Sequence, residues 1–350
     1  MEKYIFMKKE ENFFEKNKKI VGIIFARAFC CMGIVIFHFF SHSKGSFKIL
    51  YRTSNNSFGF MYVTTFFSIS GAVLYYNYPK IKSIKSFYFK RWKSIFIPFY
   101  LCYIYYYLRN SMAYHKLLFK SQLSKLFITL IGFDSYLHYR IKNTCYLVGE
   151  WFLGAIIIIY LLYPLLSLFI IKNNYLIITF VFLINVFMYK TNFFIIPKSK
   201  NIISCLTSFY FGVITIKYKN FFFGNYIILL ISFIILLSLS IFNITSFFFV
   251  LQIQGYCLYI LLINIGQYIM QTKLNIIFKE ISILSYNIFL FHHYIILDIL
   301  HIINPIEWYL HIILLTIVFV LTIIYSKINL MVFTSIIESK PFKKFESLFI

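Results

Sequence analysis

Acidic residues are scarce in this chain. Its 350 residues include 11 Asp and Glu against 34 Lys and Arg, and charged residues make up only 13% of the total. A soluble globular domain carries roughly 25% charged residues. This shortage excludes an ordinary water-facing surface. Because 61% of the residues are hydrophobic, we infer that lipid is the solvent for most of the chain.

Cysteine is also sparse and shows no pairing pattern. The six residues are dispersed, contain no CxxC pair and fall mostly inside apolar runs: Cys30, Cys31, Cys102, Cys145, Cys205 and Cys257. This pattern argues against a disulfide framework and against a metal site. A basic nucleic-acid-binding face is missing as well, since Lys and Arg are scattered over short segments between apolar runs. We therefore expect no metal and no nucleic-acid partner.

Long apolar runs dominate the sequence. A run of about 17 to 25 residues spans a hydrocarbon core at about 1.5 Å rise per residue. The sequence predicts an all-α, polytopic transmembrane bundle of about ten spans, near 20–41, 57–77, 94–110, 148–171, 175–190, 202–217, 224–243, 246–269, 282–303 and 308–330.

The spans form a single predicted domain, 20–333, between the tails 1–19 and 334–350. The first run contains Arg27 and lacks a small-residue cleavage pattern, so we read it as a retained helix. With ten spans and the N-terminus in the cytoplasm, the cytoplasmic segments, both tails included, hold 21 Lys and Arg, and the outer segments hold twelve. The positive-inside rule then favours both termini in the cytoplasm.

The only sizeable stretch outside the predicted spans is 111–147. Within it, 117–132 mixes Lys, Gln and Ser with Leu and Phe at intervals near three and four. Such spacing is typical of an amphipathic helix on the membrane surface.

Ionisable residues inside the spans are the candidates for chemistry, because a charge at the bilayer centre costs at least ~2.5–3.5 kcal/mol. They are Arg27, His38, Glu150, His292, His293 and Asp298. Eleven residues separate Arg27 from His38, which places both on one helix face ~16 Å apart. Equally, Arg27 can reach the cytoplasmic interface while His38 meets headgroups. Adjacent His292 and His293 point about 100° apart, so we expect only one of them to be central.

Two further segments each allow a structural and a functional interpretation. The stretch 66–71, FFSISG, has small residues that favour close helix packing over chemistry. The basic segment 80–93 fits anionic headgroups, or phosphate-bearing ligands.

Five motifs in order resemble the acyltransferase-3 family of bacterial membrane O-acyltransferases. They are RAFCCMGIVIFH at 27–38, FFSISG at 66–71, KRWKSIFIP at 90–98, WFLGAIIIIYLLYP at 151–164 and SYNIFLFH at 285–292. The third departs from the family, with Ser94 where a second basic residue is often found. The last motif singles out His292 over His293. Together the motifs extend over nearly the whole chain.

The resemblance implies transfer of an acyl group, commonly acetyl, from cytoplasmic acetyl-CoA to a hydroxyl of a cell-surface glycan or lipid-linked sugar. It implies a multi-pass protein of the bacterial inner membrane. His38 fits the general base, because imidazole titrates near pH 6.5. His292 and Glu150 complete the expected catalytic set. The expected donor contacts are Arg27, Lys90, Arg91, Lys93, Ser68, Ser70 and Tyr286.

A transporter or flippase for glycans or lipid-linked sugars is the main rival reading, with the buried ionisable residues lining a pathway. That reading predicts two related halves with interrupted helices, and the sequence shows no such symmetry. A purely structural scaffold would leave the intramembrane ionisable residues without a purpose.

Overall fold

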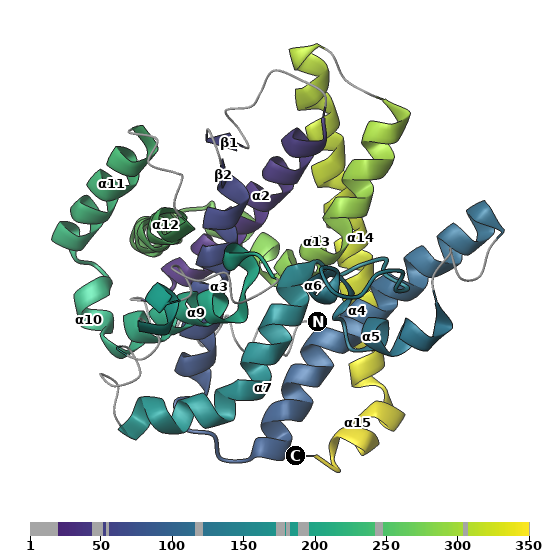
Figure 1. Cartoon of the computed structure of the whole chain (residues 1–350), viewed down its shortest axis with the longest axis horizontal. Helices are drawn as coiled ribbons and strands as arrows, with labels where there is room; N and C mark the ends of the chain where they lie inside the picture. Colours follow the sequence, from purple (N-terminus) through teal and green to yellow (C-terminus); the bar gives the residue numbers. More distant parts are fainter. Residues whose placement is uncertain are drawn as a thin grey trace. The chain divides into compact units, whose positions relative to one another are not determined.

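The computed structural model of the chain is built almost entirely of helices (Figure 1). It describes residues 20–43, 52–53, 56–115, 122–172, 179, 183–187, 196–241, 248–303 and 307–349. Within these ranges the only strands are β1 (Arg52–Thr53) and β2 (Asn56–Ser57), an antiparallel pair. The predicted tail 1–19 lies outside the described residues. The predicted span 175–190 is described only at 179 and 183–187, which are helical.

Six of the described helices are long and apolar enough to cross a membrane. Each covers most of one predicted span. They are α2 (Gly22–His42), α3 (Phe58–Asn77), α7 (Trp151–Lys172), α12 (Phe248–Ile269), α13 (Asn275–Ile302) and α14 (Trp308–Glu338).

Three other predicted spans are helical but do not meet the same criteria. The helices α9 (Ile202–Lys217) and α11 (Tyr226–Ile241) have 16 residues each. Each therefore rises about 24 Å, less than a hydrocarbon core of about 30 Å. The predicted span 94–110 lies within α4 (Ile84–Tyr114), a helix of 31 residues with Pro98 inside. The total of ten spans therefore remains a prediction.

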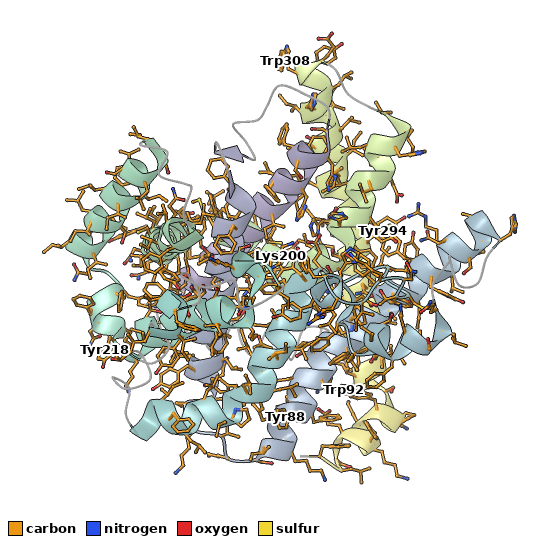
Figure 2. All side chains as sticks on the ribbon, in the orientation of Figure 1. Tyr88, Trp92, Lys200, Tyr218, Tyr294 and Trp308 are labelled. Atoms are coloured by element: carbon orange, nitrogen blue, oxygen red, sulfur yellow. The ribbon has the colours of Figure 1, made fainter. Side chains whose placement is uncertain are left out.

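Short helical elements connect the longer helices or follow the last of them. They are η2 (Leu123–Lys125), α5 (Leu126–Leu130), α6 (Asp134–Leu137), η3 (Lys198–Lys200), α10 (Lys219–Phe222) and α15 (Lys340–Glu346). Exposed aromatic side chains mark helix ends, as at Tyr218 after α9 and Trp308 at the start of α14 (Figure 2). Such residues favour the membrane–water interface.

The chain divides into two compact units. Unit 1 comprises Met1–Tyr78 and Cys205–Ile324, and unit 2 comprises Pro79–Ser204 and Tyr325–Ile350. The sequence contains no Gly-, Pro- or Ser-rich linker that predicts this division. The chain passes from one unit to the other at three points, and the last two, 204/205 and 324/325, fall inside α9 and α14.

In unit 1, α2 packs against α3, α12 and α13. Three contacts fix its direction relative to α13. The Phe25 and Phe278 ring centroids lie 4.7 Å apart, the Cys31 Sγ donates to the Ser285 carbonyl oxygen at 3.8 Å, and the His38 and His292 centroids lie 5.1 Å apart. The sequence offset stays near 254 residues from one pair to the next, so α2 and α13 run parallel.

The α3–α9 crossing in unit 1 depends on small residues. A Cβ added at Gly71 would overlap the Phe209 carbonyl oxygen, and one added at Gly212 would overlap the Ser68 carbonyl oxygen. The Ser68 Oγ, fully buried, lies 3.0 Å from the carbonyl oxygens of both Thr64 and Ser208. The segment 66–71 therefore has the close-packing role expected from its small residues.

In unit 2, the C-terminal helix α15 is attached to the N-terminal half of α4. The Lys93 ammonium forms an ion pair with Glu346, and Lys85 donates to the Leu348 carbonyl oxygen at 2.7 Å. The Phe89 and Phe349 rings stack with centroids 4.6 Å apart. The predicted tail boundary at 333/334 lies within α14, which continues to residue 338 before α15 begins.

The described part of the predicted amphipathic segment is helical. Leu123, Phe127 and Leu130 are exposed and lie on one face by their spacing of four and three. Thr129, on another face, donates to the Asp134 carboxylate at 2.8 Å. Burial raises the pKa of Asp134, and hydrogen bonds from Thr144 and Thr129 oppose that shift. The segment thus presents apolar side chains outward and buries Thr129, while Gln122 and Ser124 are exposed, and its place on the membrane surface remains a prediction.

Candidate active site

Helix α2 carries both lead residues of the candidate site. It is continuous from Gly22 to His42, so the eleven-residue spacing places Arg27 and His38 on one face about 16 Å apart. Both side chains are half-buried. This confirms the helical geometry from which the pair was predicted.

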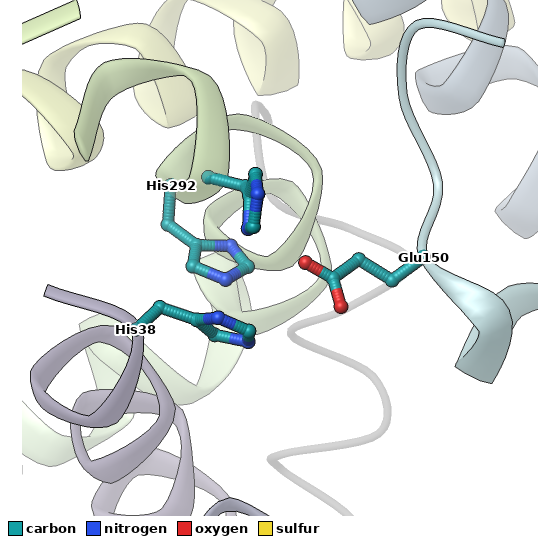
Figure 3. A group of neighbouring side chains, drawn as sticks. His38, Glu150 and His292 are labelled. Atoms are coloured by element: carbon teal, nitrogen blue, oxygen red, sulfur yellow. The ribbon is translucent and has the colours of Figure 1, made fainter. Parts of the chain in front are cut away.

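Imidazoles gather around His38 in unit 1. Its ring centroid lies 5.1 Å from that of His292 and 5.1 Å from that of His293, both on α13. The exposed His42 adds a ring 5.0 Å from His293. Figure 3 shows the His38 and His292 side chains directed toward the same space. One ring nitrogen from each of His38, His292 and His293 lies within 4.8 Å of the other two. The parallel packing of α2 and α13 produces this cluster.

The expectation that only one of the adjacent histidines is central was wrong. Both His292 and His293 contact His38 at equal centroid distance. Successive side chains on a helix do diverge by about 100°, but a partner between the two directions lies only about 50° from each. His38, on the neighbouring helix, is within reach of both imidazoles.

The backbone of α13 fixes the tautomer of His292. Its Nδ1 lies 3.0 Å from the Ile288 carbonyl oxygen and 2.9 Å from that of Phe289. A carbonyl oxygen only accepts, so Nδ1 carries the proton and donates. In the neutral ring, Nε2 therefore holds the lone pair. His292 is 1% exposed, so its Nδ1–H and its Nε2 lone pair are shielded from bulk water.

Arg27 is a half-buried cation. Among the residues that the structure describes, no carboxylate lies within ion-pair distance of its guanidinium. A cation kept in an apolar helix without an acidic partner is suited to an anionic ligand.

The other predicted donor residues of unit 1 lie on α3 and α13. Ser68 is engaged at the α3–α9 crossing, whereas Ser70 is half-buried. Tyr286 is half-buried, with its ring stacked on Phe289 at 6.2 Å. Their roles remain predictions.

The remaining predicted residues belong to unit 2. Glu150 is half-buried immediately before α7, and Lys90 is half-buried on α4. The Arg91 guanidinium carbon lies 5.9 Å from the Tyr160 ring centroid. Lys93 is 5% exposed and its charge is compensated by Glu346. Lys93 thus has a structural partner, and the four functional roles remain predictions.

Two members of the imidazole cluster lay outside the predicted catalytic set: His42, which was not a candidate, and His293, which the last motif ranked below His292. The spacing of four between His38 and His42 was a usable signal, since such residues share a helix face. His293 had no comparable signal, because its contact with His38 depends on the register between α2 and α13.

Comparison with known protein families identifies one family over most of the chain. A family profile described as an acyltransferase domain matches residues 20–327. No curated protein matches the chain, and no solved structure does. The matched range includes both helices that contribute to the imidazole cluster, five of the six helices long and apolar enough to cross a membrane, and α14 as far as residue 327. The chain belongs to the acyltransferase-3 family and is a multi-pass membrane acyltransferase.

Proposed function

We propose that the protein is an O-acyltransferase of the bacterial inner membrane that moves an acetyl group from acetyl-CoA to a hydroxyl of a cell-surface glycan or lipid-linked sugar. The observation that supports it most is the convergence of His38 with a buried His292 of fixed tautomer. A hydroxyl is a poor nucleophile at neutral pH, and a positioned imidazole is the usual group to take its proton.

His38 acts as the general base in this proposal. As the acceptor hydroxyl loses its proton to His38, its oxygen attacks the thioester carbonyl carbon. The carbon–sulfur bond then breaks, and the CoA thiolate takes the proton from His38. The step is neutral in protons overall, so no proton has to leave the membrane interior.

His292 is a positioning residue for His38. In the complex with substrate, its Nε2 lone pair is proposed to accept the N–H of one His38 ring nitrogen, which leaves the other nitrogen with a lone pair for the substrate. Glu150 is proposed to orient an imidazole or to bind the acceptor. Ser70 and Tyr286 are proposed to donate to the oxyanion of the tetrahedral intermediate.

The donor is proposed to approach from the cytoplasmic side, at the Arg27 end of α2. Acetyl-CoA carries several negative charges, which a half-buried guanidinium without an acidic partner among the described residues is suited to bind. Ser68, Lys90, Arg91 and Lys93 are the further donor contacts that we propose. The commitment of Lys93 to Glu346 and of Ser68 to the helix crossing makes Lys90 and Arg91 the stronger members of this set.

Arg27→Gln is expected to raise the KM for acetyl-CoA about tenfold to a hundredfold and to leave the KM for the acceptor unchanged. Loss of a hydrogen bond to a charged group costs about 1.5–3 kcal/mol. The measurement is transfer of labelled acetyl from acetyl-CoA to extracted glycan in isolated membranes.

Arg27→Lys is expected to give an intermediate KM, since it keeps the charge and loses the bidentate fork. Charge reversal at the exposed Lys273, also in unit 1, is the control and should change neither constant. An unchanged donor KM in Arg27→Gln would remove Arg27 from the donor site. Absence of acetyl transfer by the unaltered protein to any glycan fraction would reject the proposed function.

The parallel arrangement of α2 and α13 gives a topology prediction. In a variant without native cysteines, Ser43→Cys and Ile303→Cys follow the ends of these helices and should react with a membrane-impermeant maleimide in intact spheroplasts. Lys273→Cys, which precedes α13, should react only after permeabilisation.

Reaction of positions 43 and 303 on opposite sides would contradict the parallel packing. Reaction of both only after permeabilisation would place the N-terminus outside and reject transfer from a cytoplasmic donor toward the outer face.

A further inference from the structure

We propose that His38, His292 and His293 form a binding site for a Zn²⁺ ion, and that the bound ion blocks acyl transfer. The donor set is chemically suited to it, because neutral imidazole is a preferred ligand of zinc and related transition metals. Three histidines and one open position are also a known zinc coordination set.

The geometry requires only small adjustments. One ring nitrogen of each histidine already lies within 4.8 Å of the other two. Zn–N bonds of about 2.0–2.1 Å in a tetrahedral site correspond to N···N separations of about 3.3 Å. The largest contraction is therefore about 1.5 Å, which rotation about side-chain bonds can supply without moving α2 or α13.

The backbone prepares one ligand in advance. Metal-binding histidines usually donate the N–H of their other nitrogen to a carbonyl or carboxylate, which fixes the tautomer and ring orientation. His292 does this through Nδ1, which donates to the Ile288 and Phe289 carbonyl oxygens and leaves Nε2 for the metal. The hydrogen bonding of Nδ1 is a separate observation from the distances between the ring nitrogens, and both favour a metal ion bound by the three histidines.

The site has a route to water. His42, one turn beyond His38, is exposed, and its ring lies 5.0 Å from that of the half-buried His293. An ion arriving at this end of α2 meets His42 first and then the three buried or half-buried imidazoles.

Blocking follows because the neutral His38 ring has a single lone pair. When that lone pair coordinates Zn²⁺, the other ring nitrogen carries the proton, so neither nitrogen can accept a proton from the acceptor hydroxyl. The binding stands on geometry alone, whereas the blocking rests on the proposed function of His38 as the base.

Zinc binding is tested without any acyl donor. The full-length protein in detergent micelles is titrated with zinc chloride against a chromophoric zinc chelator. One ion per chain is expected, and His293→Gln should weaken binding at least about tenfold, since even outer-shell changes cost 10- to 100-fold. The control is His301→Gln, an exposed histidine on the same helix α13, which should bind as the unaltered protein does.

Equal zinc affinity in His293→Gln and the unaltered protein, with matching size-exclusion profiles, would overturn the site. His292→Gln provides a second variant should His293→Gln fail to fold. Blocking is measured as acetyl transfer with zinc relative to the rate of the same variant without zinc.

Zinc is expected to inhibit the unaltered protein reversibly on addition of chelator, and the half-inhibitory concentration should rise at least about tenfold in His293→Gln. Full activity with zinc bound would overturn the blocking. Absence of any transferase activity would count against the proposed function, because zinc binding is measured independently.

Discussion

His38→Gln is expected to lower the rate of acetyl transfer by about 10²- to 10⁴-fold, the usual contribution of general acid–base catalysis. Glutamine keeps a polar side chain of similar reach but cannot take a proton at neutral pH. The loss should appear in kcat, because proton removal occurs in the transition state and not in substrate binding. The measurement is initial rates with labelled acetyl-CoA at saturating donor and acceptor.

Two comparisons make this result specific. His301→Gln removes an exposed imidazole from the same unit and should keep the rate of the unaltered protein. His292→Ala should lower kcat by a smaller factor, and His292→Asn should recover part of it, because a side-chain amide can also accept the N–H of His38. A His38→Gln protein that folds normally and retains full kcat would remove the proposed base.

Gly212→Ala is expected to cause a large loss of folded protein. The added Cβ would overlap the carbonyl oxygen of Ser68 and lie 2.6 Å from its carbonyl carbon. Backbone atoms cannot rotate away, so α3 and α9 must separate and the bond from the Ser68 Oγ to the Ser208 carbonyl oxygen is lost. Overpacking of this kind typically costs about 1–3 kcal/mol, and more where backbone must shift.

The measurement is the yield of monodisperse protein in detergent and its apparent melting midpoint. Gly59→Ala is the matched control, since its Cβ would meet only the ring of the half-buried Phe37, at 2.7 Å, and a side chain can move aside. Gly71→Ala should behave like Gly212→Ala, because each added Cβ would overlap a backbone carbonyl oxygen of the other helix at the α3–α9 crossing. A midpoint for Gly212→Ala equal to that of Gly59→Ala would contradict the inferred crossing.

The sequence predicted those features of the fold that depend on a single segment of the chain. Apolar runs predicted α2, α3, α7, α12, α13 and α14, because whether a helix is long and apolar enough to span the hydrocarbon core depends on that segment alone. At α9 and α11 the predicted spans 202–217 and 224–243 are helical as well. Each of these helices has only 16 residues, so whether they cross the membrane remains a prediction.

The candidate site was predictable in part. Helical periodicity alone relates Arg27 to His38, and the small residues of 66–71 alone predict a close crossing. The identity of the crossing helix α9, the ion pair between Lys93 and Glu346, and the contact of His293 with His38 join residues far apart in the chain. None of these pairs has a local pattern that one sequence can display.

By itself the sequence determined that this protein lies in a membrane, which family it resembles, and which face of its first helix carries a cation and a base. Only the tertiary structure decided that α13 runs parallel to α2 in the register that brings His292 and His293 against His38. The physical reason is that lipid solvates every apolar helix face similarly, so hydrophobicity does not choose helix partners. Helix partners are determined by close packing and a few polar contacts, which form only when both helices are present.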